Sequence, residues 1–414
     1  MLSRGCDDMD IQSNLFEMAL GIKEPLYIKE ISFDEENGEL HIYVDFRRGS
    51  RFACPVCGQE ECAVHDTTEK VWRHLNFFQY KCYIHFWNPK IKCDKCGVRQ
   101  HMPYWARPQS GFTSLFEAFV LTLAREMPVS QIAKLVGEHD TRIWRILHYH
   151  ISKAYAAKVF SELTQVGIDE TSSRKGHKYV SVFVDMVKRE VVYATPGKDE
   201  SAIERFSEEL NSHNASSEQI TNVSMDMSPA YIRGATDHLQ NAKITFDKFH
   251  VIKQLNEAID EIRRTETAIN PCLKGSRYIW LKNPENLTDR QRDALKTLSK
   301  ENRKLAKAYQ MKLTLQGIYR TVWDYRVADV SFQKWLSWAI RSRLTPIKRF
   351  AKMFESHYEG ILQFFKSRLS AGISEGINSR IQEIKRRSKG FRNINYFISM
   401  IYLDASNLLL PSYT

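Results

Sequence analysis

Three carboxylates of this chain could together hold a pair of divalent metal ions. Asp169 lies in a short apolar segment, Asp226 ends another, and Glu375 opens a helical pattern. Phosphodiester transfer by two Mg²⁺ ions needs hard oxygen ligands around metals about 3.5 to 4 Å apart, so that one ion activates the attacking oxygen and the other stabilises the leaving one. We therefore predict Asp169, Asp226 and Glu375 as catalytic ligands of Mg²⁺ (or Mn²⁺).

The segments around the two aspartates predict the strand order of an RNase H core. VGIDET, KYVSVFVDM and EVVYATPG are apolar runs joined by polar connectors, as in an antiparallel meander. A helical stretch over 201–213 leads to a fourth strand ending at Asp226, where Ser228 and Pro229 form a helix N-cap and first turn. AKITF is the fifth strand. In this order the first and fourth strands are neighbours, so Asp169 and Asp226 should lie side by side.

The helix that begins near Glu375 has two different faces. Its apolar stripe consists of Ile373, Ile377, Ile381 and Ile384, and its polar face of Glu375, Ser379, Gln382 and Arg386. Burial of the stripe would direct Glu375 and Arg386 into a cleft for metal and phosphate. The helix ends in a basic cluster that is either a solvated helix end or a phosphate-binding track: Lys385, Arg386, Arg387, Lys389 and Arg392.

Residues 251–368 lack strand signals and read as a helical insertion between the fifth strand and the helix of Glu375. The insertion explains the long separation of Glu375 from Asp226. Its tryptophans, Trp323, Trp335 and Trp338, are either core anchors or aromatics that face bases, and the core interpretation is favoured.

Two Cys-x-x-Cys pairs, each followed by glycine, predict a zinc site. Four thiolates in two such pairs form a tetrahedral Zn²⁺ site whose metal supports folding of a small module: Cys54, Cys57, Cys93 and Cys96. The spacer over 58–92 is long for a zinc ribbon, and its segment 77–87 alternates like a strand. Upstream, Asn37-Gly38 joins two alternating segments and predicts a hairpin, so that residues 1–50 form a strand-rich lead-in.

The next segment reads as three short helices over 113–127, 129–136 and 141–155, with Gly137 between the last two. This pattern is typical of a helix-turn-helix domain, in which Ser130 would cap the second helix and the third would enter a major groove. Arg142 and Arg145 would then reach bases or phosphates. The alternative is an ordinary three-helix bundle whose apolar residues only form a core: Ile132, Leu135, Ile143, Ile146 and Leu147.

Composition favours a polyanionic partner. The 414 residues carry a formal net charge of +11, and Lys and Arg that neutralise phosphates give strong, salt-sensitive binding. Ribosomal or membrane-surface binding would also fit the charge alone. The chain has no apolar run of membrane-spanning length, and its start lacks the apolar core of a secretory signal. We expect a cytoplasmic protein with no membrane partner.

Together these motifs resemble the bacterial insertion-sequence DDE transposases of the ISL3 group, over nearly the whole chain. The resemblance rests on CPVCG with CDKCG, VGIDETS, SMDMSPAY, FDKFHVIKQLNEAIDEIRR and SEGINSRIQEIKRRSKGFRN. It implies DNA cleavage and strand transfer at the ends of a mobile element, with Asp169, Asp226 and Glu375 as metal ligands. Asp247 and His250 match an Asp-x-x-His element of the family whose role does not follow from the residues.

The resemblance also implies the partners. Double-stranded DNA would be bound at terminal inverted repeats and at the target, and joining two element ends favours a homodimer or higher oligomer. The expected fold is α/β, an RNase H-like core with a helical insertion, preceded by a zinc-binding β module and a helix-turn-helix domain. The expected domains are a lead-in (1–50), a zinc module (51–106), a helix-turn-helix domain (107–158), a catalytic domain (159–250 with 369–414) and an insertion (251–368).

Two other functions fit parts of the same sequence. A DNA-binding regulator would use the zinc and helix-turn-helix parts and keep the RNase H-like part as a platform without catalysis. A structure-specific nuclease would use the carboxylates without strand transfer. Short inverted repeats beside the coding region would argue against the regulator.

Overall fold

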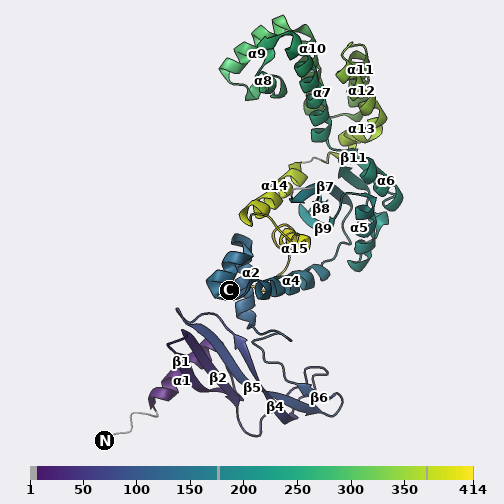
Figure 1. The fold of residues 1–414 in the computed structure, drawn as a ribbon. Coiled ribbons are helices and arrows are strands. Elements are labelled where there is room, and N and C mark those ends of the chain that lie inside the picture. The colour runs from purple at the N-terminus through teal and green to yellow at the C-terminus, as the bar shows by residue number, and fades with distance from the viewer. Residues whose placement is uncertain (1–6, 175–177, 370–371, 414) are drawn as a thin grey trace. The chain divides into compact units, whose positions relative to one another are not determined.

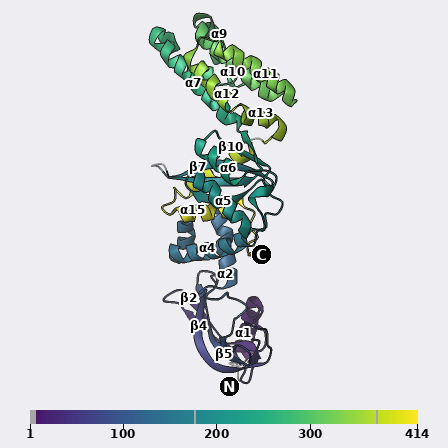
Figure 2. The ribbon, with the colours of Figure 1, turned by 90° about the vertical axis from the view of Figure 1, so that its right-hand side faces the viewer.

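The computed structural model describes residues 7–174, 178–369 and 372–413. The chain forms two compact units, Met1–His150 with Leu409–Thr414, and Ile151–Leu408 (Figures 1 and 2). Within the described ranges, no helix combines the length and the apolar character needed to cross a bilayer.

The N-terminal unit begins with a helix and a six-stranded sheet. The helix is α1 (Asp7–Leu20), and the strands are β1 (Leu26–Asp34), β2 (Glu39–Phe46), β3 (Arg51–Phe52), β4 (Cys62–Arg73), β5 (Lys81–Cys93) and β6 (Gly97–Gln100). The strand order is β1-β2-β5-β4-β3, and β6 pairs with β5. The predicted hairpin at Asn37-Gly38 is confirmed, because β1 and β2 pair antiparallel with Asp34 opposite Glu39. The helix α1 was not predicted within the strand-rich lead-in.

The lead-in and the zinc module share this one sheet, because β2 pairs in parallel with β5. Alternate residues of the paired strands point to the same side and are buried: Leu40, Ile42 and Val44 on β2, and Cys82, Ile84 and Phe86 on β5. The strand predicted over 77–87 begins only at Lys81. Phe77 and Tyr80 exchange two backbone hydrogen bonds in a tight turn, in which Phe78 has φ of 51°.

Three helices follow in the N-terminal unit, as predicted: α2 (Ser114–Glu126), α3 (Val129–Val136) and α4 (Asp140–Ala156), the last of which continues into the second unit. Thr113 caps α2, and Gly137 ends α3 in the left-handed conformation. The prediction for Ser130 is wrong, because the N-cap position of α3 is Pro128 and Ser130 lies within the first turn. Leu135 is 58% exposed and is not a core residue, whereas Ile132, Ile143, Ile146 and Leu147 are buried.

The second unit contains a mixed five-stranded sheet. Its strands are β7 (Gln165–Arg174), β8 (Lys178–Asp185), β9 (Glu190–Pro196), β10 (Asn222–Met225) and β11 (Lys243–Phe246), in the order β11-β10-β7-β8-β9. The meander β7-β8-β9 is antiparallel, and β10 is parallel to both β7 and β11. The helices α5 (Glu200–Ser212) and α6 (Pro229–His238) connect the strands where the sequence predicted them. This is the predicted RNase H-like strand order.

The predicted insertion over residues 251–368 lies within the described part of the chain and consists of helices joined by short loops, with no strand among these residues. Its helices are α7 (Lys248–Ile269), α8 (Arg277–Leu281), α9 (Asp289–Glu301), α10 (Arg303–Thr321), α11 (Tyr325–Ile340), α12 (Thr345–Ser356) and α13 (Tyr358–Ser367). Trp335 is 2% exposed and is a core residue as favoured. Trp323 is 74% exposed, so the core interpretation is wrong for this residue.

Two C-terminal helices complete the second unit: α14 (Gly372–Arg387) and α15 (Ile394–Ala405). The apolar stripe of α14 is buried at Ile377, Ile381 and Ile384, and the helix packs against β7. The helix α15 packs against β9, where the Ala194 N–H donates to the Tyr402 hydroxyl at 2.9 Å. Burial of the stripe leaves the polar face of α14 toward β7, where Asn378 of this face contacts Asp169.

Candidate functional site

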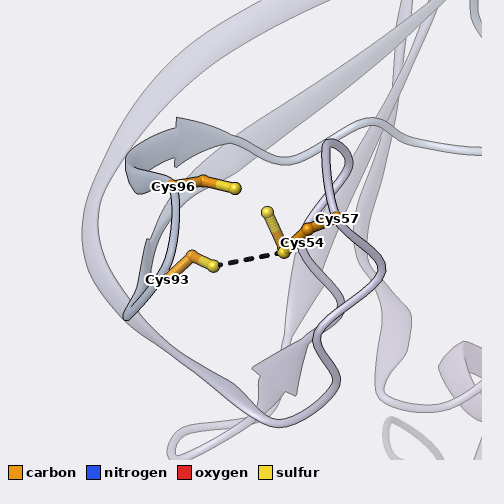
Figure 3. Close-up of side chains that lie close together, drawn as sticks. All are labelled: Cys54, Cys57, Cys93 and Cys96. Carbon is orange, nitrogen blue, oxygen red and sulfur yellow. Dashed lines mark hydrogen bonds between the residues drawn. The ribbon is translucent and has the colours of Figure 1, made fainter.

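The four predicted zinc ligands form one cluster in the N-terminal unit (Figure 3). One sulfur from each of Cys54, Cys57, Cys93 and Cys96 lies within 4.8 Å of all the others. The Sγ atoms of Cys57 and Cys93 are 3.5 Å apart. Each Cys-x-x-Cys pair ends in a tight turn, which Gly58 and Gly97 permit with φ of 72° and 73°. The spacing thus brings two turns, one before β4 and one between β5 and β6, to a common centre.

Backbone N–H groups favour the thiolate form of Cys54 and Cys93, whereas the hydrogen bond with Cys57 and burial raise the pKa of Cys96. The N–H groups of Cys57 and Val56 lower the pKa of Cys54. Burial opposes ionisation of Cys93, but the N–H groups of Cys96 and Lys95 lower its pKa to about 6. Thiolate sulfur in a set of four is the ligand arrangement of structural Zn²⁺ sites. The donor set therefore fits Zn²⁺.

The two arginines predicted to bind DNA have different surroundings at the start of α4. Arg142 pairs with Glu138 one turn earlier, and its guanidinium carbon lies 4.3 Å from the centre of the Phe112 ring. Arg145 is exposed. Glu138 also faces the buried Arg73 of β4, with 3.7 Å between Nε and Oε1. Arg142 is thus part of a network within the N-terminal unit, and Arg145 is the more accessible cation. The i,i+4 spacing of Glu138 and Arg142 was the available sequence signal for this pair.

The β7 and β10 strands bring the two predicted aspartates to one edge of the sheet. Their parallel register pairs Gly167 with Ser224, and Asp169 and Asp226 each stand two residues further along. Each aspartate bonds a nearby backbone N–H: Asp169 Oδ1 accepts from Glu170 at 2.7 Å, and Asp226 Oδ1 from Ser228 at 2.9 Å. Ser228 occupies the N-cap position of α6 as predicted, without a side-chain capping bond.

Asp169 and Glu375 line one cavity of about 780 Å³, together with Asp247, His250 and Arg386. Asp226 is half-buried and is not among the residues that line this cavity. In the part of the chain that the structure describes, a group of three or more potential metal ligands whose ligand atoms all lie within 4.8 Å of one another is found only at the four cysteines. The three carboxylates therefore share a region of the fold without converging to that distance.

A row of side-chain hydrogen bonds joins the polar face of α14 to β7. Asn378 Nδ2 donates to Asp169 Oδ2 at 2.5 Å, and Gln382 Nε2 donates to the Thr171 hydroxyl at 2.8 Å. One turn further, Lys385 Nζ donates to the Ser172 carbonyl at 2.6 Å. Asn378 is not among the site residues predicted from the sequence. Its position three residues after Glu375, on the same helix face, was the signal that could have found it.

The electrostatics of this cavity fit a divalent cation. Burial raises the pKa of Asp169, and the negative charges of Asp247 and Asp226 add to the effect. The hydrogen bond from His250 to Asp247, with 3.1 Å between Nδ1 and Oδ2, raises the pKa of His250. A bound cation would relieve the repulsion among these carboxylates, and carboxylate oxygens are the ligands that Mg²⁺ prefers.

The predicted basic cluster is divided by the structure. Arg386 lines the carboxylate cavity, whereas Lys385 is half-buried and bonded to Ser172. Lys389 and Arg392 are exposed beyond the end of α14, and Arg387 is half-buried. Only Arg386 of the five is thus placed at the cavity itself.

Three family models match consecutive parts of the chain. They are a zinc-finger of transposase IS204/IS1001/IS1096/IS1165 over residues 50–96, a helix-turn-helix domain of transposase family ISL3 over residues 100–151, and an ISL3 transposase of the DDE type over residues 166–401. The last match covers more than half of the chain and includes the β7 strand, the insertion and α14.

Curated relatives match along nearly the whole chain. The transposase for insertion sequence element IS1557 of two Mycobacterium tuberculosis strains is 28% identical over 94% of this chain and 94% of its own length. The transposase for insertion sequence element IS1001 of Bordetella parapertussis is 27% identical over 90% of this chain and 94% of its own length.

A solved simian T-cell lymphotropic virus intasome in complex with a PP2A regulatory subunit also matches, at 17% identity over 43% of this chain and 63% of that chain. Its TM-score is 0.19, which carries no argument about this fold. The family models and the cysteine cluster together decide the assignment. The chain belongs to the ISL3 family of DDE transposases, with a zinc ribbon, a helix-turn-helix domain and an RNase H-like catalytic domain.

Proposed function

We propose that this protein cleaves DNA at the ends of an insertion sequence and transfers the freed strands to target DNA. The observation that carries the proposal is the cavity in which Asp169 and Glu375, 206 residues apart in number, meet on β7 and α14. The expected reaction is in-line attack of water on the phosphodiester at the element end. The freed 3′ hydroxyl then attacks target DNA, and no covalent enzyme intermediate is required.

Asp169, Asp226 and Glu375 are the proposed ligands of Mg²⁺ or Mn²⁺. Such ions, when bound, polarise the scissile phosphate and lower the pKa of the attacking water. The chain itself contributes orientation and charge. Asn378 holds Asp169 Oδ2, and Arg386 supplies a guanidinium for a phosphate oxygen on the same wall as Glu375.

The N-terminal unit is the proposed reader of the terminal inverted repeats. Arg145 on α4 is the proposed contact to bases or phosphates, with Arg142 restricted by its pairing to Glu138. The exposed cations Lys389 and Arg392 are proposed backbone contacts, which give affinity rather than sequence preference. Because two element ends must be joined, the proposed active form is a homodimer or larger assembly on DNA.

A cleavage assay tests the proposal. The substrate is a duplex that carries the terminal inverted repeat found beside the coding region, with Mg²⁺ as the only added metal. We expect Asp169→Asn, Asp226→Asn and Glu375→Gln to lose cleavage and to keep binding of the repeat. The control is Asp237→Asn, an exposed aspartate on α6 of the same unit, which should cleave normally.

The alternative regulator predicts a different result in the same assay. The unchanged protein would bind the repeat tightly and leave it uncut under all metal conditions. Full cleavage by Asp169→Asn would instead reject the carboxylate assignment while leaving the family membership intact.

A further inference from the structure

A second cavity of the second unit, about 570 Å³ in volume, is lined mostly by residues of the insertion. Its lining residues come from α7, α10 and α13, from the loop after α10 and from Asn283 after α8. Figure 1 labels these helices. Its size is within the range of small-ligand sites, roughly 300 to 1,000 Å³. Phe249 lines both this cavity and the carboxylate cavity, so the two adjoin at the start of α7.

Two aromatic side chains at this cavity are unusually accessible. Trp323, in the loop between α10 and α11, is 74% exposed, and Phe249 is 51% exposed. Exposure of such large apolar surface has no folding benefit, because the hydrophobic effect favours its burial. Both rings nevertheless have cationic neighbours. The Arg368 guanidinium carbon lies 4.6 Å from the Trp323 ring centre, and Lys248 Nζ lies 5.7 Å from that of Phe249.

The loop that carries Trp323 is held in place by Arg368. This arginine ends α13, and its guanidinium donates a hydrogen bond to the Trp323 carbonyl in addition to its contact with the ring. The indole of Trp323 is thus exposed, while the backbone of the same residue is fixed by its hydrogen bond to Arg368. Such an arrangement presents a preformed aromatic surface, which lowers the entropic cost of binding.

The charge of the cavity suits a polyanion. Lys248, Arg320 and Arg368 line it, and the described lining residues include no Asp or Glu. Arg320 is paired with Glu285 at 2.7 Å, whereas the charges of Lys248 and Arg368 are not neutralised by an ion pair with any carboxylate that the structure describes. A phosphate-bearing ligand matches the positive charge of this cavity, whereas a cationic peptide or a peptide with few acidic residues does not.

A buried hydroxyl in the wall is an independent sign of a missing polar partner. Tyr319 is 8% exposed, and its hydroxyl has no hydrogen-bond partner among the residues that the structure describes. Buried hydroxyls are normally paired, and leaving one unpaired costs about 1 to 3 kcal/mol. Burial raises the pKa of Tyr319, and the charge of Asp247 raises it further.

We propose that this cavity binds an unpaired nucleobase of the DNA strand whose phosphate lies at the carboxylates. Trp323 and Phe249 would stack on the base, Lys248 and Arg368 would contact its flanking phosphates, and the Tyr319 hydroxyl would bond a polar edge. A base inside a duplex has no free face for such stacking, so the ligand must be unpaired. The proposal rests on the proposed function, because it takes the adjoining cavity as the site of strand cleavage.

A binding assay on the full-length, zinc-loaded protein tests the proposal without added Mg²⁺. The probes are a duplex with one bulged 2-aminopurine nucleotide and the fully paired duplex of the same sequence. We expect tighter binding of the bulged duplex and quenched 2-aminopurine fluorescence. Trp323→Ala should weaken binding of the bulged duplex about tenfold, as loss of one stacking contact predicts, and leave the paired duplex unchanged.

Two further variants make the assay specific. Trp323→Phe keeps an aromatic face and should retain most of the preference for the bulged duplex. Tyr278→Ala is the matched control, because Tyr278 is an aromatic residue of the insertion, 61% exposed and next to Arg277, that does not line the cavity. It should behave like the unchanged protein.

Three results would overturn the proposal: an unaltered preference in Trp323→Ala, an equal loss in Tyr278→Ala, or tight binding of deoxyadenosine monophosphate alone, which would make the cavity a site for free nucleotides. Failure of the cleavage proposal is distinguishable, because cleavage by Asp169→Asn in the Mg²⁺ assay would reject the carboxylates and would not alter base binding measured without Mg²⁺.

Discussion

Asn378 is the residue that connects Asp169 to the helix of Glu375. Its side-chain amide donates to Asp169 Oδ2 at 2.5 Å, across 209 positions of the chain. Because Asp169 lies on β7 and Glu375 on α14, this bond acts directly between the two elements that carry proposed ligands. Asn378 is thus a positioning residue for Asp169.

We predict that Asn378→Ala lowers the rate of end cleavage by about 10- to 100-fold, the usual effect of removing an outer partner of a metal ligand. The measurement is cleavage against Mg²⁺ concentration, in which the half-saturating Mg²⁺ concentration should rise. Gln382→Ala is the comparison, because Gln382 lies one turn further on α14 and bonds Thr171 rather than a carboxylate. An unchanged Mg²⁺ dependence in Asn378→Ala would contradict the role assigned to it.

At the scale of elements, Glu138 connects the zinc-bearing sheet to the helix-turn-helix. It follows α3 and faces both Arg73 at the end of β4 and Arg142 in the first turn of α4. Arg73 is 1% exposed, and its guanidinium also donates to the Val136 carbonyl at the end of α3. Arg73 and Glu138 thus link the sheet to the end of α3 and the start of α4.

We predict that Glu138→Ala destabilises the N-terminal unit by about 3 kcal/mol, because it leaves the buried Arg73 charge without its acidic partner. Urea unfolding of the full chain, followed by a probe in this unit, measures the change. Glu126→Ala is the control, since Glu126 is exposed at the end of α2, and it should change stability by less than about 0.5 kcal/mol. Equal stability of the two variants would show that the network does not orient the helices.

At the scale of the whole molecule, the zinc cluster and the carboxylate cavity belong to different compact units. Zinc removal should therefore act on one unit alone. We predict about one zinc per chain, and loss of amide protection in residues 52–62 and 90–100 when a chelator removes it. The strands β7, β8 and β9 should keep their protection in the same sample.

Hydrogen exchange with mass spectrometry and metal analysis measures both parts of this prediction. Cys93→Ser should reproduce the effect of the chelator, and Cys272→Ser should not, because Cys272 is an exposed cysteine of the insertion outside the cluster. Retained protection of residues 90–100 in zinc-free protein would mean that the apolar core of the sheet suffices without metal.

Local patterns in the sequence determined the elements and most candidate residues. Two Cys-x-x-Cys turns define a zinc site because ligand spacing within a turn is local. Strand alternation and helical periodicity predicted β7 to β11 and α14, because the spacing of apolar residues along each segment indicates which face of that segment is buried. The position of Asp169 beside Asp226 followed from strand order alone.

Only the tertiary structure decided which distant side chains meet. The bond of Asn378 to Asp169, the bridge from Arg73 to Glu138 and the pairing of β2 with β5 join segments whose periodicity says nothing about each other. The same reason explains Trp323: composition favours burial of tryptophan, and only the packing of α10, α11 and α13 determines that this indole remains exposed beside a cationic cavity.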